Sequence, residues 1–313
     1  MNTSIKCLVT GGAGFIGSHL CDALIDKGYE VFCVDNLITG SKKNIAHLLN
    51  NSQFHFILHD ITKPFPSTIN YLYHLASPAS PPVYRKYSIE TLLVNSLGTY
   101  NMLELAKKEN SVFLLASTSE VYGNPLTHPQ KENYYGNVNP TGTRACYDEG
   151  KRFAEAITME YVRKFKLQGR IARIFNTYGP RMQPTDGRVV SNFVTQAIAG
   201  KPLTMYGDGS QTRSFCYISD MVSGLIAACE KKGIDGEVIN LGNPQELTIK
   251  RIGEIILSLT GSSSPLVRVK KKEIDDPQMR KPDISKAKQL LGWQPSVSLD
   301  LGLKETIKYF KNL

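Results

Sequence analysis

The stretch IKCLVTGGAGFIG, residues 5–17, predicts how this chain folds. Its first five residues form a short, mostly apolar run of the kind that becomes a buried parallel strand. Glycines at positions 11, 14 and 17 follow, and they lead into a helix that is expected to end at Gly28. Because glycines let backbone amides approach a pyrophosphate at the positive end of a helix, the stretch predicts a dinucleotide-binding βα unit.

A carboxylate at the end of the next strand candidate indicates which dinucleotide is bound. Residues 30–34 lead to Asp35, which lies 18 residues beyond Gly17. At about this spacing an acid bonds the ribose 2′-hydroxyl. Since the same carboxylate repels a 2′-phosphate, we expect NAD rather than NADP as the cofactor. The alternative is a glycine-rich turn that only closes an ordinary βα unit.

Strands and helices are expected to alternate through residues 1–180. Further strand candidates are 54–58, 71–76, 112–116 and 170–175, with helices over about 91–109 and 145–166. Six strands alternating with helices predict an α/β fold with a doubly wound parallel (Rossmann) sheet. The prolines of residues 77–82 exclude a helix or a central strand there, so a loop bordering the nicotinamide and the sugar is expected.

The periodic pattern is looser after residue 180. Helices are expected over 189–199, 217–230, 248–259, 283–291 and 299–310, with a strand at 237–241 and a linker at 261–265. We therefore expect an NAD-binding domain over 1–180, which carries the catalytic residues, and a smaller lobe over 181–313. This lobe mainly binds substrate, and the chain is expected to cross between the two parts.

Composition is ordinary for a soluble globular protein, with 313 residues of which 41% are hydrophobic and 21% charged. Apolar runs stay below the roughly 18 residues of a transmembrane helix, so no membrane partner is expected. The chain passes from its first residues directly into the strand at 5–9, which leaves no room for a signal peptide. We expect a cytoplasmic location.

The charge distribution and the cysteines predict neither a nucleic-acid partner nor a metal site. The net charge of +9 is spread out, and its one dense run, residues 270–272, is predicted to be a solvated surface segment. Anionic small substrates explain a positive balance as well as nucleic acid does, so no nucleic-acid partner is predicted. Six cysteines are scattered without a C-x-x-C pair, which predicts reduced thiols rather than a disulfide framework or a metal site.

The catalytic candidates lie between residues 117 and 151. Ser117, Thr118, Ser119 and Glu120 follow the strand at 112–116, at the edge where open α/β sheets bind ligands.

Tyr147 and Lys151 are four residues apart on a predicted helix, so they lie on one face. A cation favours an ionised phenol, so the pair predicts a base near neutral pH for a sugar hydroxyl. Such pairs also occur by chance on solvated helix faces, but here a cofactor unit lies upstream. His74 is expected to be a strand residue with a hydrogen-bonded ring.

Three arginines stand in loop-like contexts of the second half: Arg188, Arg213 and Arg280. Guanidinium groups suit phosphate and carboxylate oxygens, whereas the plain alternative is an arginine at the surface or in an ion pair.

Together these motifs resemble the extended short-chain dehydrogenase/reductase family over essentially the whole chain. The resemblance is carried by residues 11–17, Asp35, 74–77, 118–120, the Tyr147/Lys151 pair and 173–180. Four longer runs resemble the UDP-glucuronate decarboxylases of that family: 135–140, 144–152, 186–193 and 275–283. Tyr135 stands where those enzymes usually have tryptophan, which is expected to affect only packing.

The resemblance implies that NAD is used and regenerated within each turnover that converts UDP-glucuronate to UDP-xylose. Tyr147, assisted by Lys151, would take the proton of the sugar 4-hydroxyl while Thr118 hydrogen-bonds the same oxygen. The resulting β-keto acid would lose CO₂. Arg280 would bind the carboxylate, and Ser119 and Glu120 would serve the oxyanion, the carboxylate or the proton for C5. A homodimer through the 91–109 and Tyr147 helices is also implied.

The resemblance further implies two sets of binding residues. Those for the cofactor are Gly11, Gly14, Phe15, Ile16, Gly17, Asp35, Asn36, Thr39, Gly40, Asp60, Ile61, Leu75, Ala76, Ser77, Asn95, Ser117, Tyr147, Lys151, Thr177 and Arg188. Those for the substrate are Pro81, Glu120, Asn176, Arg188, Val190, Tyr206, Arg213 and Arg280, with the diphosphate at Asn176, Arg188 and Arg213 and the uracil near Tyr206.

Other activities of this fold remain as alternatives. The related 4,6-dehydratases have Thr-Asp-Glu, whereas Ser119 cannot protonate a leaving hydroxide as a carboxylic acid can. A 4-epimerase needs neither Glu120 nor a carboxylate-binding arginine. A decarboxylase could also release UDP-4-keto-pentose and leave NADH behind. A non-enzymatic NAD sensor would be expected to lack the catalytic side chains that this chain retains.

Overall fold

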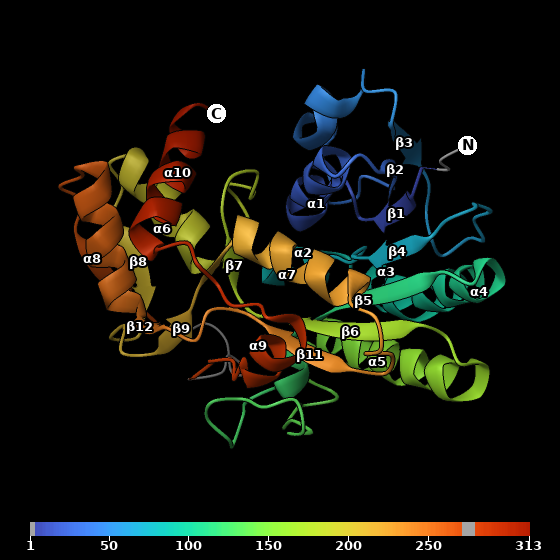
Figure 1. The fold of residues 1–313 in the computed structure, drawn as a ribbon. Coiled ribbons are helices and arrows are strands. Elements are labelled where there is room, and N and C mark those ends of the chain that lie inside the picture. The colour runs from blue at the N-terminus through green and yellow to red at the C-terminus, as the bar shows by residue number, and fades with distance from the viewer. Residues whose placement is uncertain (1–3, 271–278) are drawn as a thin grey trace.

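The computed structural model of the protein describes residues 4–270 and 279–313. Within them the largest sheet is parallel and has seven strands, in the order β11-β6-β5-β4-β1-β2-β3 (Figure 1). The strands are β1 (Lys6–Thr10), β2 (Glu30–Asp35), β3 (Phe54–Leu58), β4 (Tyr71–His74), β5 (Val112–Thr118), β6 (Gly169–Ile174) and β11 (Val238–Leu241). The order reverses between β1 and β4, so the crevice at the carboxyl ends of these strands is the expected ligand site.

Helices cover both faces of the sheet, which explains why its strands are apolar on both sides. On β1, Cys7 and Val9 pack toward α1 (Phe15–Asp26), α7 (Ile218–Glu230) and α9 (Ser285–Leu291). Leu8 points the opposite way, toward α4 (Thr99–Glu109) and α5 (Ala145–Phe165). Alternation along the strand therefore builds a core on each face.

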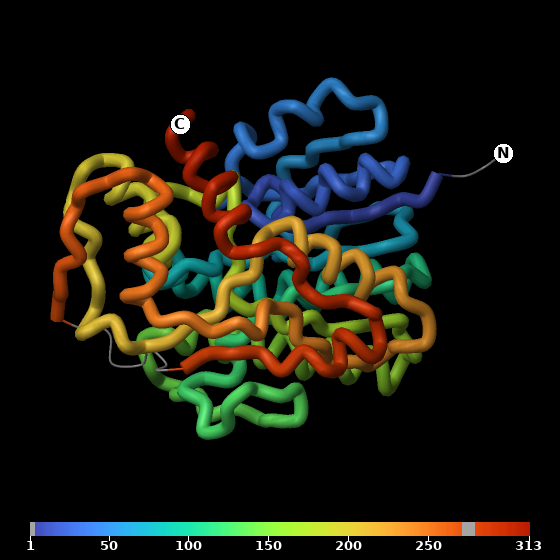
Figure 2. The backbone as a smooth tube through the Cα atoms, turned by 60° about the vertical axis from the view of Figure 1, so that its left-hand side comes forward, coloured from blue at the N-terminus to red at the C-terminus, as the bar shows by residue number. Residues whose placement is uncertain are grey.

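The second half of the chain forms a lobe with a core of its own. It consists of α6 (Val189–Ile198), α8 (Ile249–Thr260), α10 (Leu299–Lys311) and the parallel pair β8 (Leu203–Tyr206) and β13 (Leu266–Val269). Figure 2 shows the C-terminal segment, in red, running back along the sheet half before it reaches α10. The strand predicted at 237–241 is β11, which pairs with β6 at the edge of the large sheet, so a segment of the second half completes the sheet of the first.

Short elements join the two parts close to the crevice. Two short strand pairs lie there. β7 (Thr177–Tyr178) pairs with β10 (Cys216–Tyr217), and β9 (Thr212–Ser214) pairs with β12 (Glu246–Thr248). The remaining short helices are η1 (Lys42–Leu48), α2 (Pro81–Lys86), α3 (Ser88–Leu93), η2 (Val94–Gly98) and η3 (Ser119–Tyr122).

Two local expectations are corrected. Pro81 and Pro82 lie not in a loop but in the first turn of α2. A proline is accepted there because the first turn of a helix needs none of its own N–H groups for internal hydrogen bonds. The helix expected over 91–109 is divided, since the π turn η2 separates α3 from α4.

The His74 expectation is confirmed. The ring is fully buried, and its nitrogens lie 2.8 Å from Thr10 Oγ1 and 3.0 Å from Thr99 Oγ1. Burial lowers the pKa of His74 to about 3, so the ring is neutral and structural at ordinary pH.

The described residues include six free cysteines. Cys7, Cys21, Cys33, Cys216 and Cys229 are buried free thiols, and Cys146 is a half-buried one. Across residues 4–270 and 279–313, no helix has the length and apolarity to cross a membrane, and no His, Cys, Asp and Glu cluster could hold a metal ion.

Candidate active site

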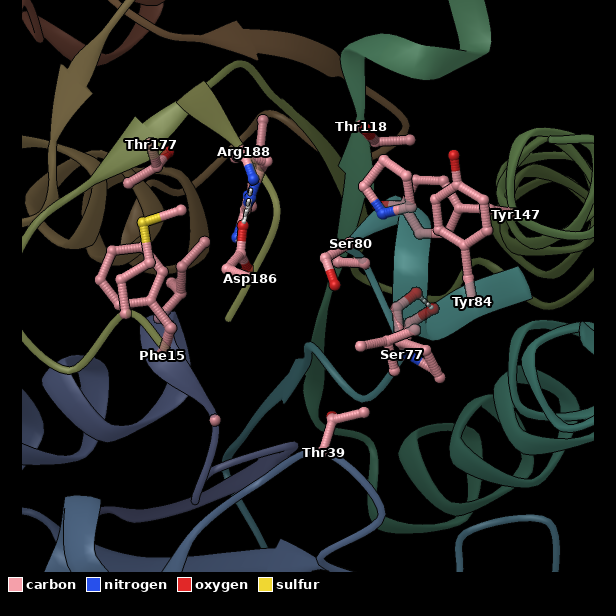
Figure 3. Close-up of a pocket in the computed structure, with 18 of the residues that line it drawn as sticks. Phe15, Thr39, Ser77, Ser80, Tyr84, Thr118, Tyr147, Thr177, Asp186 and Arg188 are labelled. Atoms are coloured by element: carbon pink, nitrogen blue, oxygen red, sulfur yellow. Dashed lines mark hydrogen bonds and ion pairs between the residues drawn. The ribbon is translucent and has the colours of Figure 1, made fainter. Parts of the chain in front are cut away.

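A cavity of about 610 Å³ opens at the carboxyl ends of the central strands (Figure 3). Its wall combines the glycine turn after β1, the ends of β2, β4, β5 and β6, and loops of the second lobe. Of the predicted site residues, which are all described, Gly40 and Asn95 do not line it and the others do. The structure thus brings nearly all of the sequence candidates together around one space.

The glycine turn packs so closely on the protein's own backbone that side chains do not fit there, and its bare backbone at Gly11, Gly14 and Gly17 lines the cavity. Gly11 has a φ of +71°, and an added Cβ there would lie 2.9 Å from the Ala76 backbone. An added Cβ at Gly17 would lie 2.1 Å from the Gly11 carbonyl oxygen. The first turn of α1, all of it described, holds no acidic side chain, so the positive end of the helix faces the cavity without a neutralising charge.

Asp35 is held in place at the end of β2, where it lines the cavity. Its carboxylate accepts hydrogen bonds from the backbone N–H groups of Ala13, at 3.0 Å, and Leu37, at 2.8 Å. Burial raises the pKa of Asp35, and these two hydrogen bonds oppose the rise. Gly40 packs against the Asp35 carboxylate, and a side chain does not fit there because a Cβ would lie 2.7 Å from both carboxylate oxygens. The glycine cradle, the helix end and this acid together fit NAD.

Asn95 lies behind the cavity wall in the π turn η2. Its amide donates to Ser77 Oγ at 2.9 Å and to the Thr91 carbonyl oxygen at 2.8 Å. Ser77 lines the cavity, so Asn95 orients a lining residue.

Tyr147 and Lys151 both reach the cavity from α5. The Tyr147 ring stacks on Tyr84 with centroids 5.3 Å apart and planes at 3° (Figure 3). Lys151 Nζ donates to the Ala116 carbonyl oxygen at 2.8 Å. Burial lowers the pKa of Lys151 to about 8, and Glu155 opposes this shift. The ammonium is therefore present at neutral pH and is lost as the pH rises through about 8.

The Tyr147 phenol differs from the expectation of a base near neutral pH. Burial raises the pKa of Tyr147 to about 12, although a hydrogen bond with Thr118 lowers it. The cost of taking a phenolate out of water outweighs the hydroxyl contact in this site. The phenol is therefore neutral at rest, and a further positive charge in the cavity is needed to favour its ionised form.

Glu155, which the sequence analysis did not single out, acts on the site through Lys151. It follows Lys151 by one helical turn, and that spacing was the available signal. Its carboxylate accepts hydrogen bonds from Ser117 Oγ at 2.5 Å and from Arg173 Nε at 2.9 Å and Nη2 at 2.7 Å. This partly buried ion pair holds a negative charge beside the Lys151 ammonium.

Replacing Glu155 by Gln is expected to move the alkaline limb of the kcat profile to lower pH. Glu155 raises the pKa of Lys151, so its loss lets burial lower that pKa further below about 8. The measurement is kcat against pH for both proteins. Glu160→Gln is the matched control, because Glu160 lies on the same helix in an exposed pair with Arg163. An unchanged alkaline limb in Glu155→Gln would contradict this role.

Glu120, in η3, lies between the side chains of Arg144 and Arg280. Arg280 binds both carboxylate oxygens, with Nη2 2.8 Å from Oε2, and Arg144 Nη2 also bonds Oε2. Burial alone would raise the pKa of Glu120, but the guanidinium groups outweigh it and lower the pKa to about 2. Arg144, which the sequence analysis did not single out, also lies 3.7 Å from Asp148. Burial and Glu120 raise the pKa of Asp148 to about 7.

The remaining arginines enter the cavity from the second lobe. Arg188 pairs with Asp186 through Nε at 2.5 Å and Nη2 at 2.8 Å (Figure 3). Arg213 is buried and donates to the Thr212 carbonyl oxygen at 2.8 Å. Pro81, Asn176, Val190 and Tyr206 complete this side of the wall.

Two of the runs named above extend partly beyond the described residues. Residues 275–278 of the 275–283 run, and residues 271 and 272 of the basic run, lie outside the described residues. Arg280 is described, and it is buried. Tyr135, by contrast, is 88% exposed, so the aromatic side chain there faces solvent.

Known proteins resemble this chain along nearly its whole length. The family model for GDP-mannose 4,6 dehydratase matches residues 8–306. UDP-glucuronic acid decarboxylase 1 of Arabidopsis thaliana is 52% identical over 308 residues, which are 98% of this chain and 70% of that protein. The Xenopus tropicalis protein of the same name is 52% identical over 306 residues, 98% of this chain and 72% of that one.

Among solved structures, the UDP-glucuronic acid 4-epimerase of Bacillus cereus in complex with UDP-glucuronic acid and NAD superposes with a TM-score of 0.89. It is 35% identical, and the match covers 98% of this chain and 99% of that one. This neighbour shares the fold and carries NAD, in agreement with the glycine cradle and Asp35 described above. The chain therefore belongs to the extended short-chain dehydrogenase/reductase family and, within it, to the UDP-glucuronic acid decarboxylases.

Proposed function

We propose that this protein decarboxylates UDP-glucuronate to UDP-xylose through a UDP-4-keto intermediate, with NAD as a cofactor that each turnover regenerates. The observation that supports this most is the position of Arg280. Its buried guanidinium lines the same cavity as Tyr147 and Lys151 and binds a carboxylate, that of Glu120. An acid-recognising group thus stands beside an oxidation site.

The first step is oxidation at C4 of the sugar. Tyr147 takes the proton of the 4-hydroxyl, Thr118 hydrogen-bonds the same oxygen, and the Lys151 ammonium favours the phenolate. When bound, NAD⁺ supplies the hydride acceptor for C4 and a positively charged ring that favours the ionised phenol. The substrate becomes a β-keto acid, and the Tyr147 phenol keeps the proton.

The second step is loss of CO₂. The bond between C5 and the carboxylate breaks, and its electron pair passes into an enolate conjugated with the C4 carbonyl. Arg280 holds the carboxylate, and Ser119 hydrogen-bonds the enolate oxygen. Glu120, which Arg144 and Arg280 keep ionised, positions Arg280 for the substrate carboxylate and orients the water that delivers the proton to C5. Re-reduction at C4, with the proton returned by Tyr147, gives UDP-xylose, so each turnover takes up one proton.

The residues of the second lobe serve the nucleotide. We propose that Asn176, Arg188 and Arg213 bind the diphosphate and that Tyr206 borders the uracil, with Pro81 and Val190 closing the wall. All of them line the cavity. Guanidinium groups match the geometry of phosphate oxygens.

The test is incubation of the purified protein with UDP-glucuronate. We expect release of CO₂ and formation of UDP-xylose without net NADH. Accumulation of NADH with UDP-4-keto-pentose would instead identify a decarboxylase that releases its intermediate. An epimerised uronate without CO₂ would overturn the proposal in favour of a 4-epimerase.

An exposed apolar face supports a homodimer. Large apolar side chains that are 39–63% exposed lie on α3, η2, α4 and α5: Ile89, Leu92, Leu93, Leu97, Tyr100, Phe153 and Phe165. These helices pack against one another, and exposed apolar surface gathered on neighbouring helices is typical of an interface. A cytoplasmic location is also proposed, because free thiols such as these persist in reducing compartments.

Leu97→Arg is expected to halve the molar mass in solution, because it buries a charge in this face. The measurement is light scattering after size exclusion. Leu126→Arg, at a residue that is 82% exposed and away from these helices, is the control and should leave the mass unchanged. A wild-type protein with the molar mass of a monomer, or a Leu97→Arg protein with the molar mass of the wild type, would contradict the proposal that this face is a dimer interface.

A further inference from the structure

Arg280 lies outside the helices and strands of the described chain, yet its side chain is buried. It begins a short extended segment, residues 280–283, which leads into α9. An arginine that must meet a carboxylate with two parallel hydrogen bonds needs a fixed backbone. Neighbouring residues must therefore hold this segment in place.

One support is a parallel bridge between Gln130 and Pro282. Gln130 N–H donates to the Lys281 carbonyl oxygen at 2.9 Å, and Asp283 N–H donates to the Gln130 carbonyl oxygen at 2.8 Å. The Gln130 side chain, which is fully buried, adds a third link, since its Oε1 accepts from Lys281 N–H at 2.8 Å. Its own amide donates to Thr127. Gln130 therefore holds both backbone polar groups of Lys281, the residue next to Arg280.

A second support joins this bridge to the large sheet. Asn240, in the edge strand β11, is fully buried. Its side-chain amide donates to the carbonyl oxygens of Gln130, at 3.0 Å, and Asp283, at 3.2 Å. One side chain thus connects both halves of the bridge to a rigid strand.

The same residue also connects to Glu120, the partner of Arg280. Asn240 Oδ1 accepts from the Tyr122 hydroxyl at 2.7 Å, and Tyr122 lies in η3 with Glu120. Arg173 donates to that hydroxyl from the other side at 3.0 Å. Asn240 is therefore the point where the Arg280 segment and the Glu120 turn are fixed to one element.

We propose that Asn240, acting through Gln130, is a positioning residue that sets the Arg280 guanidinium on the substrate carboxylate and thereby determines the preference for a uronate over a neutral UDP-hexose. This inference rests on the proposed function, because it takes Arg280 as the group that binds that carboxylate. Asn240 and Gln130 do not line the cavity within the described residues, so they act on the substrate only through others.

The experiment compares KM for UDP-glucuronate with the inhibition constant of UDP-glucose, using the full-length NAD-loaded enzyme. Asn240→Asp keeps the shape and the acceptor for Tyr122 but removes the amide donor. Gln130→Met removes the acceptor for Lys281 and keeps the backbone bridge. We expect each to raise KM for UDP-glucuronate by about 10- to 100-fold and to leave the UDP-glucose constant within about twofold.

A double substitution gives a readout that a merely structural role would not move. Added to Arg280→Ala, either substitution should cause no further loss of preference, since the group that they position is absent. Thr306→Val, which removes a fully buried hydroxyl bonded to Gly302 within α10, is the control and should leave the preference unchanged. If Asn240→Asp does not fold, Gln130→Met decides alone.

The outcomes separate the two proposals. If Arg280→Ala keeps the preference, the role of Arg280 in the proposed function fails, and this inference fails with it. If Arg280→Ala loses the preference but Asn240→Asp and Gln130→Met retain it, the inference alone is overturned. Equal losses of both ligands would also overturn it, because they would indicate general destabilisation.

Discussion

Tyr147→Phe is expected to lower kcat on UDP-glucuronate by about 10³-fold while KM stays close to the wild-type value. The substitution removes the one oxygen that is proposed to take and return the C4 proton, and it keeps the ring that stacks on Tyr84. Proton transfer is a transition-state interaction, so its loss should appear in kcat and not in binding. The measurement is steady-state CO₂ release together with NAD and UDP-glucuronate binding.

A matched control lies on the same helix. Tyr161 bonds Glu104 through its hydroxyl, away from the cavity, so Tyr161→Phe should leave kcat unchanged. A Tyr147→Phe enzyme with kcat near the wild-type value would show that another group moves the proton. Thr118, which shares a hydrogen bond with Tyr147, would then be the first candidate for the group that moves the proton.

Arg280→Ala is expected to lower kcat/KM for UDP-glucuronate by about 10²- to 10³-fold, since truncating one member of a buried, hydrogen-bonded charge pair costs about 2–5 kcal/mol. The same change removes one of the charges that stabilise ionised Glu120, so the pKa of Glu120 should rise from about 2. The kcat/KM of Arg280→Lys should lie between those of the wild type and of Arg280→Ala, because an ammonium keeps the charge but does not form two parallel hydrogen bonds.

The control for Arg280→Ala is Arg251→Ala, which removes an exposed arginine paired with Glu254 on α8 and should leave kcat/KM unchanged. The pKa of Glu120 can be followed by carboxyl-carbon NMR. An Arg280→Ala enzyme with wild-type KM would place the carboxylate-binding group elsewhere in the cavity, with Arg144 as the next candidate because it also binds Glu120.

Much of the cofactor half could be predicted from the sequence because its signals are local. A strand, a glycine turn and a helix follow one another within residues 5–28, and each is set by the period of a few neighbouring side chains. The face shared by Tyr147 and Lys151 likewise follows from the helix repeat alone. The strand at 237–241 was found too, although periodicity could not tell which sheet it would join.

Within the first half, the local sequence pattern did not predict the start of α2 or the π turn η2. The prolines at 81 and 82 predict that no helix forms there, yet they begin α2. Composition shows which residues disfavour a helix interior, but the location of the first turn depends on where the preceding strand ends. The π turn η2 was equally invisible, since its residues alone show no break in the helical pattern.

The sequence by itself determined the Rossmann half, the NAD cofactor and the family, because these depend on short-range periodicity and on motifs that are contiguous in the chain. Only the tertiary structure decided that Glu120 meets Arg280 from 160 residues away, that Gln130 and Asn240 hold that arginine, and that Glu155 stands behind Lys151. It also decided the pKa of Tyr147, since the free energy of desolvating a phenolate is a sum over everything packed around it.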